Sequence, residues 1–352
     1  MKKYLLLALI VLCLAAFLTA CSEDTPPQPD PTPEPIETYE PEPTPEPVRY
    51  RNPLTGLPVE EDISANRPIA ILLDNIQMAL PQHGIRQADI IYEIPVEGGI
   101  TRLLAVFQDL RGVEEIGPVR SVRHYIVDIA QGHDAIFVHA GGSPQGYEAI
   151  RYRGVPNIDG VLGSGREFWR DSGRIQRAGS EHSMMTSDEL ILSNLEDRGF
   201  RLEHEDRFHP GLLFLPDATI NGTPTQEVVV EFSTHKTGMF RYDAETDTYR
   251  VYQYSAPHMD GHAGEQLHVT NVIVLFASFS VIDNEGRLNV SFDLGGTGYY
   301  ITGGQRVPIL WTKGSFTSPF FYTLEDGTPL AMRPGQIYVS IVNTNTGSVT
   351  FG

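Results

Sequence analysis

The first 21 residues constrain this chain more than any other feature. Two lysines precede an apolar run from Tyr4 to Ala20, which ends in Leu18-Thr19-Ala20-Cys21. A basic start, an apolar stretch and small residues before a cysteine form the lipobox pattern that lipoprotein signal peptidase recognises. We predict that residues 1–20 are a signal peptide and that Cys21 becomes the first residue and carries a lipid such as palmitate. An ordinary secretory signal or an uncleaved anchor is the alternative.

Lipidation would place the mature chain outside the cytoplasm, attached to the cell membrane at Cys21. The sequence has two cysteines, Cys13 and Cys21. The first would leave with the signal peptide and the second would carry lipid, so no disulfide is expected. The folded part must then be stable through its hydrophobic cores.

Residues 21–48 have the composition of a spacer. They contain ten prolines, eight acidic residues and no basic residue. Such a segment cannot bury enough apolar area to fold, and it favours extended polyproline II. We predict a stiff tether that holds a globular part away from the membrane, near the cell-wall polymer of a Gram-positive envelope.

The overall charge excludes one class of partner. The chain has 26 basic and 45 acidic residues, a net charge of −19. A protein held to nucleic acid by phosphate contacts needs the opposite balance. We therefore expect no nucleic acid partner.

Residues 49–215 have the pattern of an α/β domain. Apolar runs at 68–74, 88–94 and 100–109 predict strands, with Gly98-Gly99 as the turn between the last two. Helical spacing of apolar residues follows Gly117-Pro118 and ends near Gly132. A capping-box pattern at 186–189 predicts a further helix that ends near Gly199.

Residues 216–352 have the pattern of a β-rich domain. Strand-like runs lie between Gly, Asn and Asp turns, at 228–232, 249–254, 267–276, 288–292, 307–311 and 337–342. The expected fold is therefore an α/β module followed by a mainly β module, with a boundary between residues 210 and 222.

Several short blocks together resemble the YerB-like lipoproteins of Gram-positive bacteria. The blocks are Asn52-Pro53-Leu54-Thr55-Gly56, Arg67-Pro68, Ala88-Asp89-Ile90-Ile91-Tyr92-Glu93, Glu97-Gly98-Gly99-Ile100-Thr101-Arg102, Gly117-Pro118-Val119-Arg120-Ser121-Val122-Arg123 and His139-Ala140-Gly141-Gly142-Ser143-Pro144. The resemblance implies two adjoining domains of uncharacterised function. The family pattern implies a Pro-His-Asn type stretch where this chain has Ser180-Glu181-His182-Ser183-Met184, so the resemblance assigns no role to His182.

Two arginines at a predicted helix start suggest an anion site. Arg120 and Arg123 stand where the helix dipole disfavours cations. Backbone N–H groups at a helix start bind phosphate, and paired guanidinium groups would add a bidentate clamp. The alternative is structural pairing with carboxylates such as Glu93, Glu97 or Asp128.

Glu93, Glu97 and Arg102 surround the predicted turn at Gly98-Gly99. Glu97 and Arg102 could pair with each other or frame a polar pocket. Paired carboxylates also raise glycosidase chemistry, but sequence spacing does not establish the required separation.

The segment from His139 to Pro144 follows a predicted strand at its carboxyl end, the edge where α/β sheets bind ligands. Ser143 either contacts a ligand or caps the next helix, with Pro144 at the first helical position. The stretch lacks the second glycine of a nucleophile elbow, which disfavours a serine hydrolase.

No resident cofactor is predicted, and a divalent metal is held open as an alternative. The candidate ligands are the histidines of His258-Met259-Asp260-Gly261-His262, with His268 nearby. Asp74, at a strand end, is a further polar or hard-cation ligand candidate.

The order of Asp74, Ala88-Asp89 and Pro118-Val119-Arg120 also looks like the layout of LytR-CpsA-Psr transferases, which act on polyprenyl-linked polymers. Our main hypothesis is a lipid-anchored protein that binds an anionic or glycan envelope ligand, a cell-wall polymer or an envelope protein. The expected ligand-binding residues are Asp74, Glu93, Glu97, Arg102, Arg120, Arg123, His139 and Ser143. The alternative is a transferase or hydrolase acting on polyprenyl-phosphate-linked or wall glycan, so an enzymatic role stays open.

Overall fold

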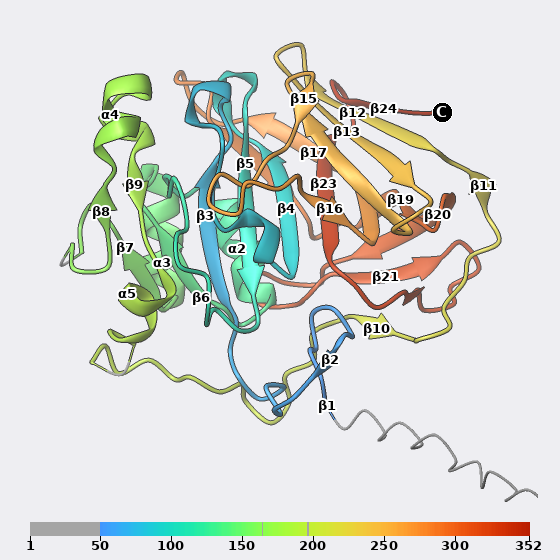
Figure 1. Ribbon diagram of the computed structural model, residues 1–352, viewed down its shortest axis with the longest axis horizontal. Helices are drawn as coiled ribbons and strands as arrows, with labels where there is room; N and C mark the ends of the chain where they lie inside the picture. The colour runs from blue at the N-terminus through green and yellow to red at the C-terminus, as the bar shows by residue number, and fades with distance from the viewer. Residues whose placement is uncertain (1–49, 164, 196) are drawn as a thin grey trace, which may run out of the picture. The chain divides into compact units, whose positions relative to one another are not determined.

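The computed structural model describes residues 50–352 except residues 164 and 196. The predicted signal peptide, Cys21 and the tether lie outside the described residues. The described residues group as one compact unit, which is mostly β (Figure 1). In the described part of the chain, no helix has the length and hydropathy needed to span a membrane.

Helices occur in the first half of the described chain. The α-helices are α2 (His124–Gly132), α3 (Pro144–Arg153), α4 (Ser172–Ala178) and α5 (Asp188–Leu192). Short 3-10 turns are η1 (Gln77–Ala79), η2 (Ile85–Gln87), η3 (Glu97–Gly99) and η4 (Ser180–His182).

Strands run through the whole described chain. Those of the first half are β1 (Tyr50–Arg51), β2 (Pro58–Val59), β3 (Ile69–Asp74), β4 (Ile90–Pro95), β5 (Thr101–Phe107), β6 (Ile136–His139), β7 (Asn157–Asp159), β8 (Trp169–Arg170) and β9 (Met184–Met185). Those of the second half are β10 (Leu213–Phe214), β11 (Thr223–Pro224), β12 (Glu227–Ser233), β13 (Lys236–Asp243), β14 (Thr248–Gln253), β15 (Ala256–Pro257), β16 (His268–Val269), β17 (Asn271–Val281), β18 (Leu288–Ser291), β19 (Gly296–Thr302), β20 (Gln305–Thr312), β21 (Phe321–Leu324), β22 (Ala331–Met332), β23 (Ile337–Asn343) and β24 (Ser348–Phe351).

One long sheet organises the molecule. Its strand order is β11-β20-β19-β17-β23-β4-β5-β3-β6-β7, with β18 and β21 paired at the side. A smaller sheet has the order β15-β14-β13-β12-β24, with β16 beside β14. In Figure 1 the blue and green N-terminal strands and the orange and red C-terminal strands meet at β4 and β23.

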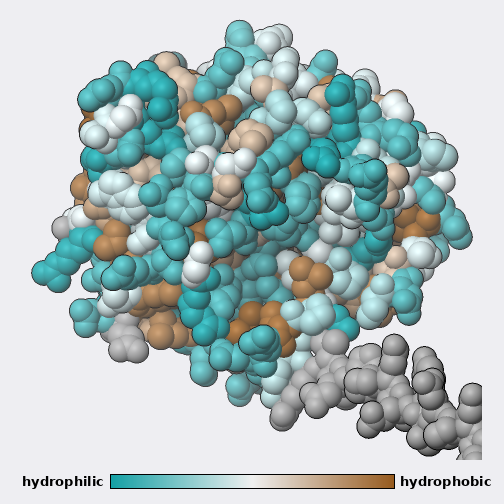
Figure 2. All heavy atoms as spheres, in the orientation of Figure 1, coloured by the Kyte–Doolittle hydropathy of each residue, from teal (hydrophilic) through white to brown (hydrophobic). Residues whose placement is uncertain are grey.

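The long sheet is covered on both faces, which explains its near-continuous apolar runs. Along β3, Ala70 and Leu72 join one hydrophobic core, whereas Ile71 and Leu73 join the other. The first core includes the apolar side of α2, and the second includes the inner face of the smaller sheet. Figure 2 shows a mostly hydrophilic outer surface with smaller hydrophobic patches.

The predicted boundary between residues 215 and 216 is not a break between separate sheets. β23, from the second predicted domain, pairs in parallel with β4, from the first, over Ile337↔Ile90 to Ser340↔Glu93. Long-range strand pairing of this kind leaves no local sequence signal. The two segments therefore share one sheet, and independent folding of each is not expected.

Local sequence signals predicted several elements well. Gly98 and Gly99 both have positive φ and connect the antiparallel strands β4 and β5. Ser187 caps α5 by accepting a hydrogen bond from Leu190 N at 3.2 Å, but α5 ends at Leu192 instead of near Gly199. The prediction of a longer helix was wrong, because Leu195 reaches the core from the turns that follow α5, without a continuous helix.

Candidate functional site

Three arginines and two carboxylates lie together at the ends of β3 and β5. We call Arg102, Arg120, Arg123, Asp74 and Glu97 the arginine cluster. Asp74 and Arg102 are register partners on the antiparallel strands β3 and β5. Arg120 N donates to Leu72 O at 2.8 Å, which holds the loop before α2 against β3. The structure thus brings together five of the eight residues expected to bind ligand.

Two of the three arginines are paired. Arg120 Nε lies 3.1 Å from Asp74 Oδ2, and its Nη1 donates to Glu181 O at 3.0 Å. Arg123 Nε donates to Glu97 Oε2 at 2.9 Å, and its Nη2 pairs with the other oxygen of the same carboxylate. Although burial opposes it, this pairing lowers the pKa of Glu97. The structural alternative therefore holds for Arg123, which is also buried.

Arg102 is different, because it is a buried cation without a hydrogen-bond partner. The residue is 4% exposed, and its Nε and Nη1 have no partner among the described residues. The nearby charges are those of the other four cluster residues. Burial and the charge of Arg123 lower the pKa of Arg102 to about 10, which still leaves it charged at neutral pH. An unsatisfied buried charge is expensive, so a ligand or water is expected to satisfy it.

A cleft of about 500 Å³ lies beside Arg120. Its lining includes two arginines, Arg120 and Arg170, one carboxylate residue, Glu181, and the glycines Gly141 and Gly142. Of the arginine cluster, only Arg120 lines this cleft. Gly141 has a φ of 76°, a conformation that favours glycine. Exposed apolar side chains, Val161 and Leu162, form another part of the wall. The cleft thus combines cations with an apolar surface.

His182 lies inside this region, although the sequence assigned it no role. Its Nδ1 lies 2.6 Å from Asp74 Oδ2, and its Nε2 lies 3.1 Å from Glu181 Oε1. The Asp74 carboxylate therefore contacts both His182 and Arg120. Such a shared carboxylate positions both side chains, and only their tertiary arrangement reveals it.

Glu93 lies outside the arginine cluster, in a separate buried network. It accepts hydrogen bonds from Asn75, Thr101 and Tyr338 at 2.9, 2.7 and 2.7 Å. Lys236 Nζ lies 3.2 Å from the same carboxylate. Because Tyr338 and Lys236 come from the second half of the chain, Glu93 joins the two halves. The structure thus supports a structural role for Glu93 in place of the expected one.

His139 and Ser143 shape the cleft wall from behind. His139 is fully buried, with Nδ1 2.9 Å from Gly141 O and Nε2 3.2 Å from Asn157 Oδ1. Ser143 caps α3 by accepting from Gly146 N at 3.0 Å. The N-cap alternative is confirmed for Ser143, and both side chains are engaged within the protein.

Asp159 and Tyr147 were missed by the sequence reasoning. Asp159 accepts hydrogen bonds from Gly141 N at 2.8 Å, Val161 N at 2.9 Å and the Tyr147 hydroxyl at 2.9 Å. Burial and this last hydrogen bond raise the pKa of Tyr147. One carboxylate at the end of β7 therefore holds three residues that line the cleft, Gly141, Tyr147 and Val161. A lone Asp after a short strand gave no sequence signal for this.

The stretch at 258–262, the metal alternative in the sequence, places its two histidines apart: His262 lies with His83 and Glu115, and neither His258 nor His268 belongs to that group. His258 is buried, with Nε2 2.9 Å from Gln82 Oε1. Asp260 accepts from the backbone N–H groups of His262 and Ala263. These contacts stabilise the turn. His258 contacts Gln82, whereas His262 lies beside His83 and Glu115.

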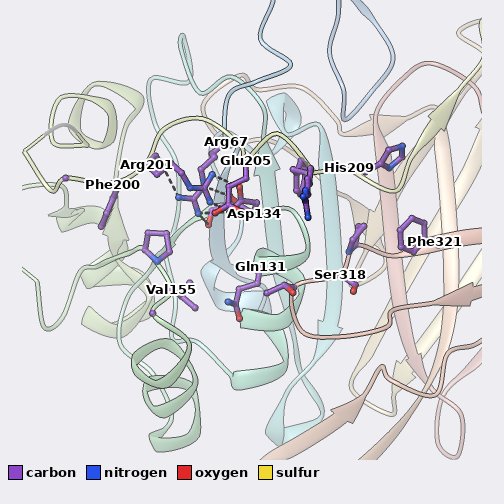
Figure 3. A pocket seen from close by; sticks show the side chains of 18 residues that line it. Arg67, Gln131, Asp134, Val155, Phe200, Arg201, Glu205, His209, Ser318 and Phe321 are labelled. Atoms are coloured by element: carbon purple, nitrogen blue, oxygen red, sulfur yellow. Dashed lines mark hydrogen bonds and ion pairs between the residues drawn. The ribbon is translucent and has the colours of Figure 1, made fainter.

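A larger cavity, of about 820 Å³, lies on another part of the unit (Figure 3). Two of its three arginines, Arg67 and Arg201, pair with one carboxylate. Asp134 pairs with Arg67 at 3.1 Å and with Arg201 at 2.7 Å, as the dashed lines in Figure 3 show. His204 Nδ1 lies 2.9 Å from the same carboxylate.

Comparison with known proteins supplies the family. Residues 54–201 match the family described as "Protein of unknown function (DUF3048) N-terminal domain", and residues 228–339 match its C-terminal domain. The "Putative lipoprotein YerB" of Bacillus subtilis (strain 168) is 29% identical over 345 residues, covering 97% of this chain and 96% of that protein. The crystal structure of YerB from Bacillus subtilis aligns with a TM-score of 0.76 at 29% identity, covering 86% of this chain and all of that one. The sequence, the two matched domains and the shared fold together show that this chain belongs to the YerB-like family.

Proposed function

We propose that this chain is a lipid-anchored extracytoplasmic protein that binds a phosphate-bearing ligand of the cell envelope at the arginine cluster. The name of its relative, together with the pattern ending in Cys21, supports the anchor. The single observation that supports the ligand is Arg102, a buried guanidinium without a hydrogen-bond partner in the described chain.

The charge balance of the cluster favours an anion. Three arginines face two carboxylates, Asp74 and Glu97, which leaves one positive charge uncompensated. A phosphate oxygen accepts several hydrogen bonds, and a guanidinium fork matches it in geometry. A neutral glycan would leave the Arg102 charge without a counter-ion.

The neighbouring cleft favours an amphipathic ligand. Arg120 and Arg170 provide two cations against the one carboxylate of Glu181, whereas Val161 and Leu162 expose apolar surface at 55% and 72%. A lipid-linked phosphate offers both a charged head and an apolar chain. Undecaprenyl phosphate is therefore the probe of choice, with inorganic phosphate as the probe of the charged head alone.

Binding of undecaprenyl phosphate in detergent micelles tests the proposal. We expect Arg102→Gln and Arg120→Gln to weaken binding at least about tenfold, the loss of one charge-assisted contact. Arg111→Gln is the matched control, since Arg111 is an exposed arginine paired with Asp109. Equal affinity in all four proteins would exclude the arginine cluster as the site. If inorganic phosphate binds with the same dependence, the head alone determines recognition.

The anchor has its own test. Metabolic labelling with a clickable fatty acid should mark the wild-type chain but leave Cys21→Ala unlabelled. Equal labelling of both would contradict lipidation at Cys21.

The transferase or hydrolase alternative requires a reacting group beside the ligand. Ser143 is engaged as a helix cap, whereas Asp74 pairs with His182, an arrangement that can also orient a general base. Binding needs no reacting group, and it is the function that the cluster supports best.

A further inference from the structure

Three metal-binding side chains from distant segments lie together on the molecule, away from the arginine cluster. They are His83, Glu115 and His262, and their ligand atoms all lie within 4.8 Å of one another. His83 and Glu115 come from the first half of the chain, and His262 comes from the second. We propose that they bind one divalent transition metal ion of the Zn²⁺ class.

The donor atoms are close to what a single ion requires. His83 Nδ1 lies 2.7 Å from Glu115 Oε2, and His262 Nδ1 lies 3.8 Å from the same oxygen. Ligands bound to one zinc at about 2.0–2.2 Å in a tetrahedron lie roughly 3.3 Å apart. The observed separations bracket this value, so small side-chain rotations would complete the geometry.

A second carboxylate lies where an outer partner of a metal-bound histidine belongs. His262 Nε2 lies 3.3 Å from Glu114 Oε2, on the side of the ring opposite to Nδ1. Metal-bound histidines commonly donate their other ring N–H to a carboxylate, which fixes the tautomer. Glu114 would thus leave His262 Nδ1 deprotonated and directed at the metal.

The backbone holds the three segments in place. His83 N donates to Gly117 O at 2.8 Å, and Gly261 N donates to Gln82 O at 2.7 Å. Gly261 lies so near the His83 ring that a Cβ at this position would be 2.5 Å from His83 Cδ2. The absence of a side chain at Gly261 is therefore what allows its neighbour His262 to lie beside His83.

The donor set selects the class of metal. Two imidazoles and one carboxylate suit Zn²⁺ and related transition metals, whereas Ca²⁺ and Mg²⁺ prefer oxygen ligands alone. The side chains of His262 and Glu115 are 36% and 42% exposed, so an ion can enter from solvent. Bound metal would connect the turn at 258–264 to the first half of the chain.

Zinc titration by calorimetry tests the site in the full chain carrying Cys13→Ser and Cys21→Ser, which leaves no thiol to compete. We expect one site in this parent and at least about tenfold weaker binding in His83→Ala, His262→Ala and Glu115→Gln. Glu114→Gln should weaken binding by about 10–100-fold through its effect on His262. His268→Ala is the matched control, because His268 lies in the same half of the chain but outside the group.

Thermal unfolding gives a second readout. Zinc should raise the Tm of the parent and of the His268→Ala variant, but not that of the His83→Ala variant. His262→Gln replaces the ring with a side chain of similar polarity, and should lose zinc binding while keeping the parent Tm in the absence of metal. No heat of binding in the parent, or equal zinc affinity in the His262 and His268 variants, would overturn the proposal.

Discussion

The cavity around Asp134 and the arginine cluster both contain buried or half-buried arginines, yet they differ in one respect. Around Asp134, Arg67 donates to three backbone carbonyl oxygens and pairs with the carboxylate. In the arginine cluster, Arg102 is buried without any hydrogen-bond partner among the residues described. Arg67, which lines the larger cavity, is thus more fully hydrogen-bonded than Arg102. The size of a cavity and the presence of unsatisfied hydrogen-bond donors are independent features. Unsatisfied donors are the feature that indicates a ligand.

The largest effect expected from this comparison is at Arg67. Arg67→Leu would remove the donor of three backbone carbonyls and one of the partners of Asp134, which keeps Arg201 and His204. We therefore expect a loss of about 3 kcal/mol in the free energy of unfolding. Urea denaturation measures this loss. Arg207, which lines the same cavity, provides the control variant Arg207→Gln, with little change. A loss below about 1 kcal/mol at Arg67 would remove the contrast between the two regions.

At Arg102 we expect substitution to raise the free energy of unfolding instead of lowering it. Replacing an unpartnered buried charge with an apolar side chain of similar length removes its desolvation penalty, so Arg102→Met should stabilise the ligand-free protein by about 1 kcal/mol or more. Arg123→Met is the matched comparison, because it breaks the pair with Glu97 and should destabilise. Urea midpoints of both variants and the wild type, measured without phosphate, test this expectation. Destabilisation of both variants to the same extent would mean that Arg102 is a structural residue.

A smaller effect on stability is expected at Asp89, where the group removed from solvent is a carboxylate instead of a guanidinium. Asp89 is a half-buried carboxylate that accepts hydrogen bonds from Asn52 Nδ2 and Gln108 N at 2.9 and 2.6 Å. Burial nevertheless raises the pKa of Asp89 to about 6. A folded pKa above the unfolded value stabilises at low pH, and this stability is lost as pH rises through about 6.

We therefore expect Asp89 to lower stability by about 1 kcal/mol between pH 5 and pH 7, from linkage over its raised pKa. Asp89→Asn, which stays neutral, should lack this part of the pH dependence. Urea midpoints of both proteins at pH 5 and 7 provide the measurement. Parallel pH profiles would indicate that the two hydrogen bonds keep the carboxylate charged throughout.

The sequence by itself determined the features that depend on neighbouring residues. The apolar run at β3, the turn at Gly98-Gly99 and the cap at Ser143 all follow from local periodicity, backbone freedom and hydrogen bonding. The two arginines at the helix start, Arg120 and Arg123, led to the prediction of an anion site, which stays a prediction.

Only the tertiary structure decided how distant segments meet. Arg123 pairs with Glu97, whereas Nε and Nη1 of Arg102 have no hydrogen-bond partner among the described residues. Both residues are arginines, so the residue type alone did not distinguish them. β23 pairs with β4, and His262 lies beside His83 and Glu115. These contacts join residues far apart in the chain, and long-range packing selects them from many combinations with equal local propensity.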